Sequence, residues 1–178
     1  MQRTTEIIWA LSLMFTLTAA GLDLRTRRIP NWLTVSAFSV GLIMHTIIGG
    51  WRGTLFSLSG AALALVLLLP PVLIRVLGAG DWKLMGAVGA VVGPVLMLFI
   101  LGVSIFAVGL MAMVQMVRAR RVVETFRNMW VLFRGFFTFG LKANAQVSLD
   151  TPHAMKLPFG VAVALATLLC FGAARWFV

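Results

Sequence analysis

The sequence is poor in charged side chains. Charged residues make up 11% of the 178 residues, whereas hydrophobic residues make up 61%, and the mean hydropathy is +1.01. This composition is far too apolar for a soluble domain of this size. Because a lipid-embedded chain must satisfy its own backbone hydrogen bonds, we predict an all-α polytopic protein embedded in the lipid bilayer.

Cysteine and histidine, the residues that most often bind zinc, are nearly absent. Cys170 is the single cysteine and lies in the last apolar run, which excludes a disulfide framework and a paired-cysteine zinc site. His45 lies inside an apolar run and His153 in a polar connector, and neither has Cys or Glu at ligand spacing. We therefore expect no metal site and no cofactor.

Acidic residues are also scarce, with five Asp and Glu against 15 Lys and Arg. The basic residues lie in connectors between apolar runs, which argues against nucleic-acid binding. Asp23 ends the first apolar run, and Asp81 begins a later one. A carboxylate at such a position is costly and usually functional. The other acids are Glu6 near the start, and Glu124 and Asp150 in a polar connector.

The apolar runs predict about six transmembrane helices in a single membrane-embedded domain, residues 1–178. A span needs about 20 apolar residues, so residues 82–93 form a short one, whose glycines and alanines suit close helix packing. The predicted spans are residues 6–22, 33–50, 55–77, 82–93, 95–117 and 157–178.

The first apolar run has a second interpretation. Residues 6–22 could be a secretory signal, because Thr18-Ala19-Ala20 resembles a small-residue cleavage site. The flanking charges oppose this, since Arg3 before the run is offset by Glu6, whereas three arginines follow the run closely. We therefore interpret residues 6–22 as a transmembrane span.

Basic residues predict the orientation in the membrane. If six spans bring both termini to one side, three of the 15 Lys and Arg residues lie on that side and twelve on the other. The positive-inside rule makes the second side cytoplasmic. Two crossings separate Asp23 from Asp81, so both acids return to the same side of the membrane. We therefore expect them to face the cytoplasm.

Two carboxyl groups at one membrane depth can act as an acid–base pair. In a low-dielectric site they cannot both ionise easily, so the ionised one can take a proton from water while the protonated one polarises a carbonyl. Gly78 and Gly80 are expected to allow irregular backbone beside Asp81, and Lys83 and the helix N-terminus to favour its anion. The alternative is that Asp23 and Asp81 only form exposed ion pairs at the interface.

Two segments that adjoin spans have an unusual combination of residues. Asp23-Leu-Arg-Thr-Arg-Arg-Ile-Pro-Asn31 places an acid before basic residues and Ile-Pro-Asn, and Gly78-Ala-Gly-Asp-Trp-Lys-Leu84 has the pattern GxGD-x-K-L. Together they resemble the signature segments of the type IV prepilin peptidases, the bacterial GxGD aspartic proteases. Lys156-Leu-Pro-Phe-Gly160 also resembles the Pro-Phe-Gly segment of that family, although Val161 and Ala162 lack the proline often found there.

The resemblance implies that Asp23 and Asp81 are the catalytic aspartates of a protease in the bacterial inner membrane. It implies a prepilin or prepilin-like substrate whose short basic leader is cut at the cytoplasmic face, and hence a role in type IV pilus biogenesis and protein secretion. The matched motifs also contain residues that we expect to support the site: Gly78, Gly80, Lys83, Arg25, Pro30, Asn31, Pro158 and Gly160.

The departures from the family pattern indicate which branch of the family this chain resembles. Larger members have an N-terminal domain with paired cysteines and also methylate the new N-terminus, whereas this chain begins with a span and has Cys170 alone. We therefore expect peptidase without methyltransferase activity, similar to the short branch that processes Flp-type, tight-adherence pilins. The alternative is a non-enzymatic transporter or secretion-machinery scaffold that uses the aspartates for proton coupling or structure.

Residues 118–156 form a polar connector with interleaved basic and aromatic residues. Within it, residues 122–139 have the composition of a basic amphipathic helix in the membrane interface. The simpler interpretation is an anchor to anionic lipid. The other is a substrate gate or a docking element for a partner pilus component.

Overall fold

The computed structural model describes residues 2–74, 77–118 and 158–176. All regular secondary structure in these residues is helical, which confirms the all-α prediction. The connector 118–156 lies outside the described residues, apart from Arg118. The interfacial helix predicted for residues 122–139 therefore lies outside them as well. The described helices are α1 (Gln2–Thr26), α2 (Asn31–Leu73), α3 (Ala79–Val92), α4 (Pro94–Arg118) and α6 (Phe159–Trp176).

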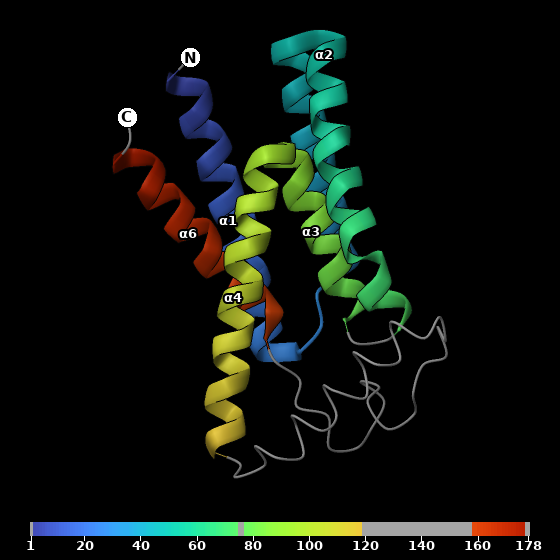
Figure 1. Ribbon diagram of the computed structural model, residues 1–178. Helices are drawn as coiled ribbons and strands as arrows, with labels where there is room; N and C mark the ends of the chain where they lie inside the picture. The colour runs from blue at the N-terminus through green and yellow to red at the C-terminus, as the bar shows by residue number, and fades with distance from the viewer. Residues whose placement is uncertain (1, 75–76, 119–157, 177–178) are drawn as a thin grey trace.

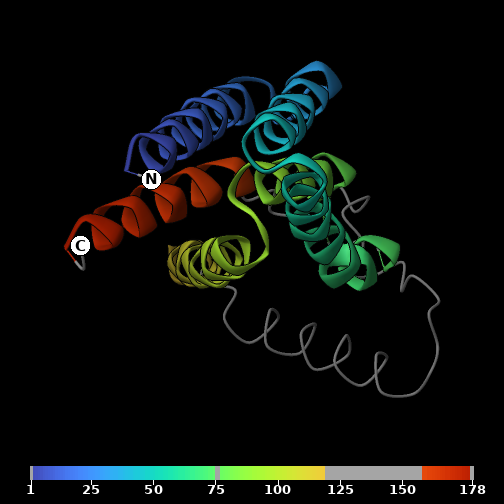
Figure 2. The same ribbon diagram turned by 90° about the horizontal axis from the view of Figure 1, so that it is seen from above.

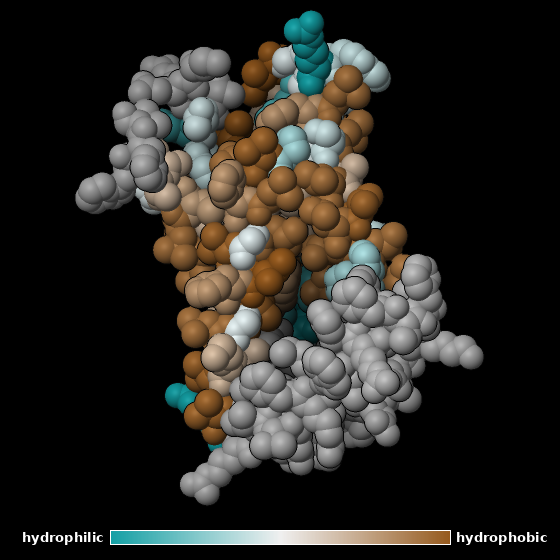
Figure 3. All heavy atoms as spheres, viewed as in Figure 1, coloured by the Kyte–Doolittle hydropathy of each residue, from teal (hydrophilic) through white to brown (hydrophobic). Residues whose placement is uncertain are grey.

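Three stretches of helix are long and apolar enough to cross a membrane: Thr5–Thr26, Asn31–Leu73 and Pro94–Gln115. A shorter apolar helix covers Phe159–Ala174. The chain is therefore a membrane protein, and the outside of the bundle is mostly hydrophobic between its two ends (Figure 3). The predicted count of six spans is not confirmed, because only three stretches of the described residues have the length and hydropathy of a span and α3 has only 14 residues.

The long helix α2 turns back on itself at Gly50 (Figure 1). Gly50 has φ 55° and ψ −138°, a conformation that glycine adopts without a Cβ clash. Beyond the turn the arms are so close that a Cβ on Gly53 would overlap the carbonyl oxygen of His45. The predicted spans 33–50 and 55–77 fall on these arms, so both ends of α2 lie at the same end of the bundle.

That end also receives the C-terminus of α1, the N-terminus of α3 and the N-terminus of α6 (Figure 1). The chain's N-terminus, the turn of α2 and the C-terminal end of α6 lie at the opposite end. We call the first of these the site end, because it holds both aspartates. Residues that are far apart in the sequence are thereby brought to one level of the bundle.

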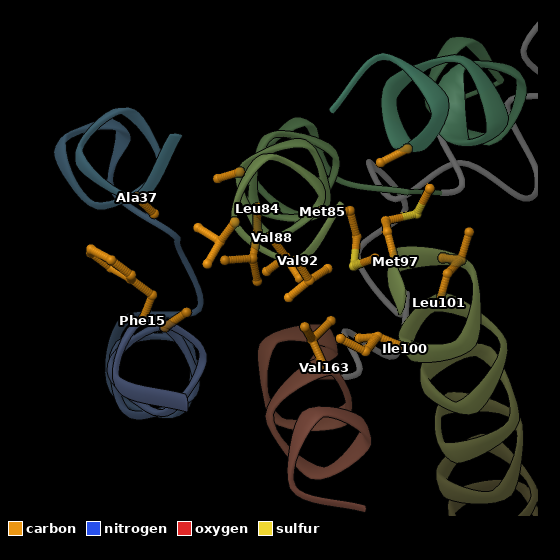
Figure 4. Close-up of a cluster of buried hydrophobic side chains, with 14 of the residues drawn as sticks. Phe15, Ala37, Leu84, Met85, Val88, Val92, Met97, Ile100, Leu101 and Val163 are labelled. Carbon is orange, nitrogen blue, oxygen red and sulfur yellow. The ribbon is translucent and has the colours of Figure 1, made fainter. Parts of the chain in front are cut away.

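The short helix α3 lies at the centre of the bundle (Figure 2). Every residue from Leu84 to Val92 is buried. Apolar side chains of α3 meet Phe15 of α1, Ile100 of α4 and Val163 of α6 (Figure 4). The helix ends at Gly93, whose φ of 80° lets Pro94 start α4 directly. The prediction of a short, closely packed helix is thus confirmed.

Two glycines determine how closely α3 packs against α2. A Cβ on Gly89 would overlap the carbonyl oxygen of Gly60, and a Cβ on Gly60 would overlap that of Gly89. Both contacts are with backbone atoms, which cannot rotate away. Small residues at facing positions are the usual means by which membrane helices approach this closely.

Replacing Gly89 by alanine is expected to destabilise the protein by about 1–3 kcal/mol, the usual cost of overpacking a core. The apparent melting temperature in detergent should fall, and less protein should accumulate in the membrane. Gly102→Ala is the matched control, because a Cβ on Gly102 of α4 would have no neighbour within 4 Å. Equal melting temperatures for the two variants would contradict the packing argument.

The C-terminal end of α3 lies inside the bundle, where its last carbonyl groups have no helical donor. The Ser57 hydroxyl donates a hydrogen bond to the carbonyl of Ala90 at 2.8 Å. His45 Nε2 lies 2.9 Å from the carbonyl oxygen of Val91. His45 and Ser57 are both buried, and they satisfy groups that would be costly to leave unpaired in an apolar surrounding.

Candidate active site

Asp23 lies in the last turn of α1 at the site end, and only 6% of it is exposed. Its Oδ2 accepts a hydrogen bond from the backbone N–H of Gly160, with an N···O distance of 2.9 Å. Gly160 is in the first turn of α6, where backbone N–H groups have no partner within their own helix. A buried carboxylate needs such a donor, because its dehydration is costly.

Asp81 lies in the first turn of α3 and is partly buried. Its carboxylate accepts a hydrogen bond from the backbone N–H of Gly78, the N-cap residue of α3. An acid in the first turn of a helix commonly bonds back to its N-cap in this way. The position is outside the three stretches long enough to span the membrane.

The two carboxyl groups are close enough to interact electrostatically. Burial raises the pKa of Asp81, the negative charge of Asp23 raises it further, and the Gly78 hydrogen bond lowers it, with a result of about 7. The N–H of Gly78 at the start of α3 favours the Asp81 anion, in the predicted direction, but it does not prevent the rise in pKa. The predicted effect of Lys83 stays a prediction. Dehydration has the larger effect on the pKa, because a partly buried carboxylate loses more stabilisation by water than one N–H hydrogen bond restores.

The glycines before Asp81 have a different role from the one predicted. Gly78 has φ −69° and ψ 142°, which any residue adopts, and Gly80 is helical. A Cβ on Gly78 would lie 3.2 Å from Oδ2 of Asp81, and a Cβ on Gly80 would lie 3.4 Å from Cβ of Ile29. Gly78 therefore leaves room for the carboxyl group, and Gly80 lets α3 approach the connector before α2.

Lys83 and Asn31 lie at the exposed edge of the site end. The Lys83 ammonium donates a hydrogen bond to Oδ1 of Asn31 at 3.1 Å. Asn31 is the first residue of α2, and Pro30 before it is the N-cap residue. This contact joins the start of α2 to the first turn of α3, so it supports the position of Asp81 from outside. Arg25 is exposed in the last turn of α1.

Pro158 and Trp82 take part in hydrogen bonds at the starts of α6 and α3. The carbonyl of Pro158 accepts a hydrogen bond from the N–H of Ala162 at 3.4 Å, which begins α6. Trp82 Nε1 donates to the carbonyl of Leu65 in α2 at 2.8 Å. This hydrogen bond of Trp82 was not predicted, because no local pattern indicates which distant carbonyl an indole will reach.

Each aspartate is thus held by a backbone N–H at the start of a helix, and the two helix starts converge at the site end. A pair of coupled carboxyl groups can share one proton, so that one acts as a base and the other as an acid. Among the described residues, no group of three or more His, Cys, Asp or Glu side chains could hold a metal ion. The site therefore supports acid–base chemistry by carboxyl groups.

Comparison with known proteins agrees with this chemistry. Residues 10–113 match the model of a family described as the type IV leader peptidase family, and this stretch contains both aspartates. The searches of curated proteins and of solved structures found no match. The family match covers more than half of the chain and confirms the resemblance seen in the sequence motifs. The chain belongs to the type IV leader peptidase family.

Proposed function

We propose that this protein is an aspartic endopeptidase in which Asp23 and Asp81 activate water to remove the leader of a type IV prepilin-like precursor. The observation that carries the proposal is the electrostatic coupling of these two carboxyl groups. Burying a carboxyl group in an apolar bundle is costly, and Asp23 is almost fully buried. Neither aspartate has an obvious structural use that would offset this cost.

The chemistry needs one proton on the pair. The carboxylate takes a proton from water, the water oxygen attacks the scissile carbonyl carbon, and the protonated carboxyl donates a hydrogen bond to the carbonyl oxygen. The first carboxyl then transfers its proton to the amide nitrogen as the C–N bond breaks. One water molecule is consumed, and a new carboxyl terminus and a new amino terminus are released.

The distribution of basic residues supports a location of the site at the cytoplasmic face of the bacterial inner membrane. Basic residues gather at the ends of α1, α3 and α4 that lie at the site end, whereas three of the described basic residues lie near the other end. The positive-inside rule places the richer side in the cytoplasm. The first group is Arg25, Arg27, Arg28, Lys83 and Arg118, and the second is Arg3, Arg52 and Arg175.

The precursor that we propose as substrate is a Flp-type prepilin. The support is the resemblance of the chain to the short, peptidase-only branch of the family, without methyltransferase activity. Such a precursor joins a short basic leader to a hydrophobic stem, and a stem that lies in the membrane would bring the cleavage site to the level of the two carboxyl groups.

Co-expression with a Flp-type precursor tests the proposal. Wild-type protein should shorten the precursor, whereas Asp23→Asn and Asp81→Asn should each leave it uncut at unchanged membrane levels, as measured by immunoblotting. Glu6→Gln is the matched control, because Glu6 is an exposed acid near the start of α1, at the opposite end. Processing that continues in either aspartate variant would exclude the dyad mechanism.

Replacing Gly78 by alanine is expected to lower kcat/KM by about tenfold, because small displacements of catalytic groups have large effects on rate. The added Cβ would lie 3.2 Å from Oδ2 of Asp81 and push the carboxyl aside. Gly21→Ala is the control, since a Cβ there has no neighbour within 4 Å although Asp23 is two residues away. Equal kcat/KM values for Gly78→Ala and Gly21→Ala would show that space beside Asp81 is unimportant.

A further inference from the structure

The N-terminus of α6 is the third helix end at the carboxyl pair. Gly160 is buried there, and its N–H points at Oδ2 of Asp23 from a helix other than the one that carries Asp23. The fit is close, because a Cβ on Gly160 would lie 3.1 Å from Cβ of Asp23 and 3.3 Å from the carbonyl oxygen of Ala19. A Cβ at this position would require its neighbours to move by a few tenths of an ångström, so glycine fits here with the least disturbance.

Asp23 needs this donor because of its own position. It lies in the last turn of α1, where the helix dipole and the free carbonyl groups oppose a negative charge. The N-terminus of α6 presents the opposite end of a helix dipole and a free N–H group to the same carboxylate. The start of α6 thus offsets the unfavourable end of α1.

We propose that Gly160 is a positioning residue whose N–H holds Oδ2 of Asp23 in place, so that Asp23 is the general base and Asp81 the general acid. This inference rests on the proposed function and adds a division of roles between the two carboxyl groups. The hydrogen bond also orients Asp23, because it leaves Oδ1 as the oxygen available to water.

Asp81 has the properties of the other partner. It is coupled to the charge of Asp23, and even with the N–H of Gly78 its pKa stays near 7. Asp81 is therefore the carboxyl group that retains a proton up to about pH 7. A protonated Asp81 can donate a hydrogen bond to the scissile carbonyl oxygen, which is the task of the acid.

Among the residues that the structure describes, few other charged groups lie near Asp23. On its own helix, Arg25 follows in the exposed last turn, and Arg27 and Arg28 lie just beyond. On α3 the charged groups near the site are Asp81 itself and Lys83, whose ammonium binds Asn31. The only charged residue of α6 is Arg175, at its far end. The helix α6 therefore acts on Asp23 through its backbone and not through a charged side chain.

Replacing the amide of residue 160 by an ester, through incorporation of glycolic acid, tests the proposal on the full-length protein. The ester removes the N–H without adding an atom. With a Flp-type precursor peptide as substrate, kcat should fall about tenfold with little change in KM, because the base is less well oriented.

Gly160→Ala and Gly160→Pro provide the second comparison. Both add a Cβ, but only proline removes the N–H, and proline is tolerated in the first turn of a helix. With KM near the wild-type value in each, kcat should fall about as far in the proline variant as in the ester and much less in the alanine variant. If the ester and proline variants cleave with a wild-type kcat while Asp23→Asn is inactive, the role of Gly160 is refuted and the dyad is not.

Discussion

Replacing either Asp23 or Asp81 by asparagine is expected to lower kcat by at least about a thousandfold, and replacing both is expected to cost hardly more than the larger single loss. The reason is that the two carboxyl groups share one proton and one water molecule. An amide at either position can neither accept the proton of water nor supply an acidic proton. Once one partner is lost, the other has no reaction left to assist.

Single-turnover cleavage of a Flp-type precursor by purified protein in detergent would measure these rates for the two single variants and the double variant. Equal melting temperatures would show that the losses are chemical. Independent effects would multiply, so a double variant slower than wild type by the product of the two single-variant factors would contradict a shared mechanism. Residual rates near that of wild type in either single variant would contradict the dyad itself.

The rate of cleavage is expected to fall about tenfold per pH unit on the alkaline side of pH 7. The pKa of Asp81 is raised to about 7 by burial and by the charge of Asp23. Above that value Asp81 loses its proton and can no longer donate a hydrogen bond to the scissile carbonyl oxygen. Below that pH Asp81 stays protonated, so the alkaline limb of the profile reports the loss of its proton.

The profile of kcat/KM between about pH 5 and 9 tests this, because it reports the ionisation of the free enzyme. Samples held at the highest pH and returned to neutral pH should regain full activity, which separates titration from unfolding. A rate that stays level or rises from about pH 7 to 9 would show that the reaction does not use protonated Asp81.

Several features of the fold were predictable because they depend on local patterns. The low content of charged residues indicated a membrane protein, and the spacing of apolar runs indicated that Asp23 and Asp81 return to the same side. The small residues of 82–93 indicated a short helix in close contact with its neighbours, and α3 is such a helix. The number of spans was harder to predict, since α3 has only 14 residues and is shorter than a full crossing requires.

The environment of each carboxyl group was not predictable in the same way. The motif placed a lysine and a helix start beside Asp81, which suggested an anion, but burial by the surrounding helices outweighs both. The capping of α3 by His45 and Ser57 was also missed, because these contacts cross between helices. Burial and contacts of this kind depend on packing, which no single segment contains.

The sequence by itself determined that this is an all-α membrane protein and which two acids meet, because hydrophobic run lengths and the parity of crossings are properties of the chain read in order. Only the tertiary structure decided how the acids are held. The N–H of Gly160 reaches Asp23 across 137 positions of the chain, and its direction is set by where α6 begins against α1. That placement follows from helix packing, and it gives Asp23 a donor from another helix, whereas the donor to Asp81 is the N-cap of its own helix.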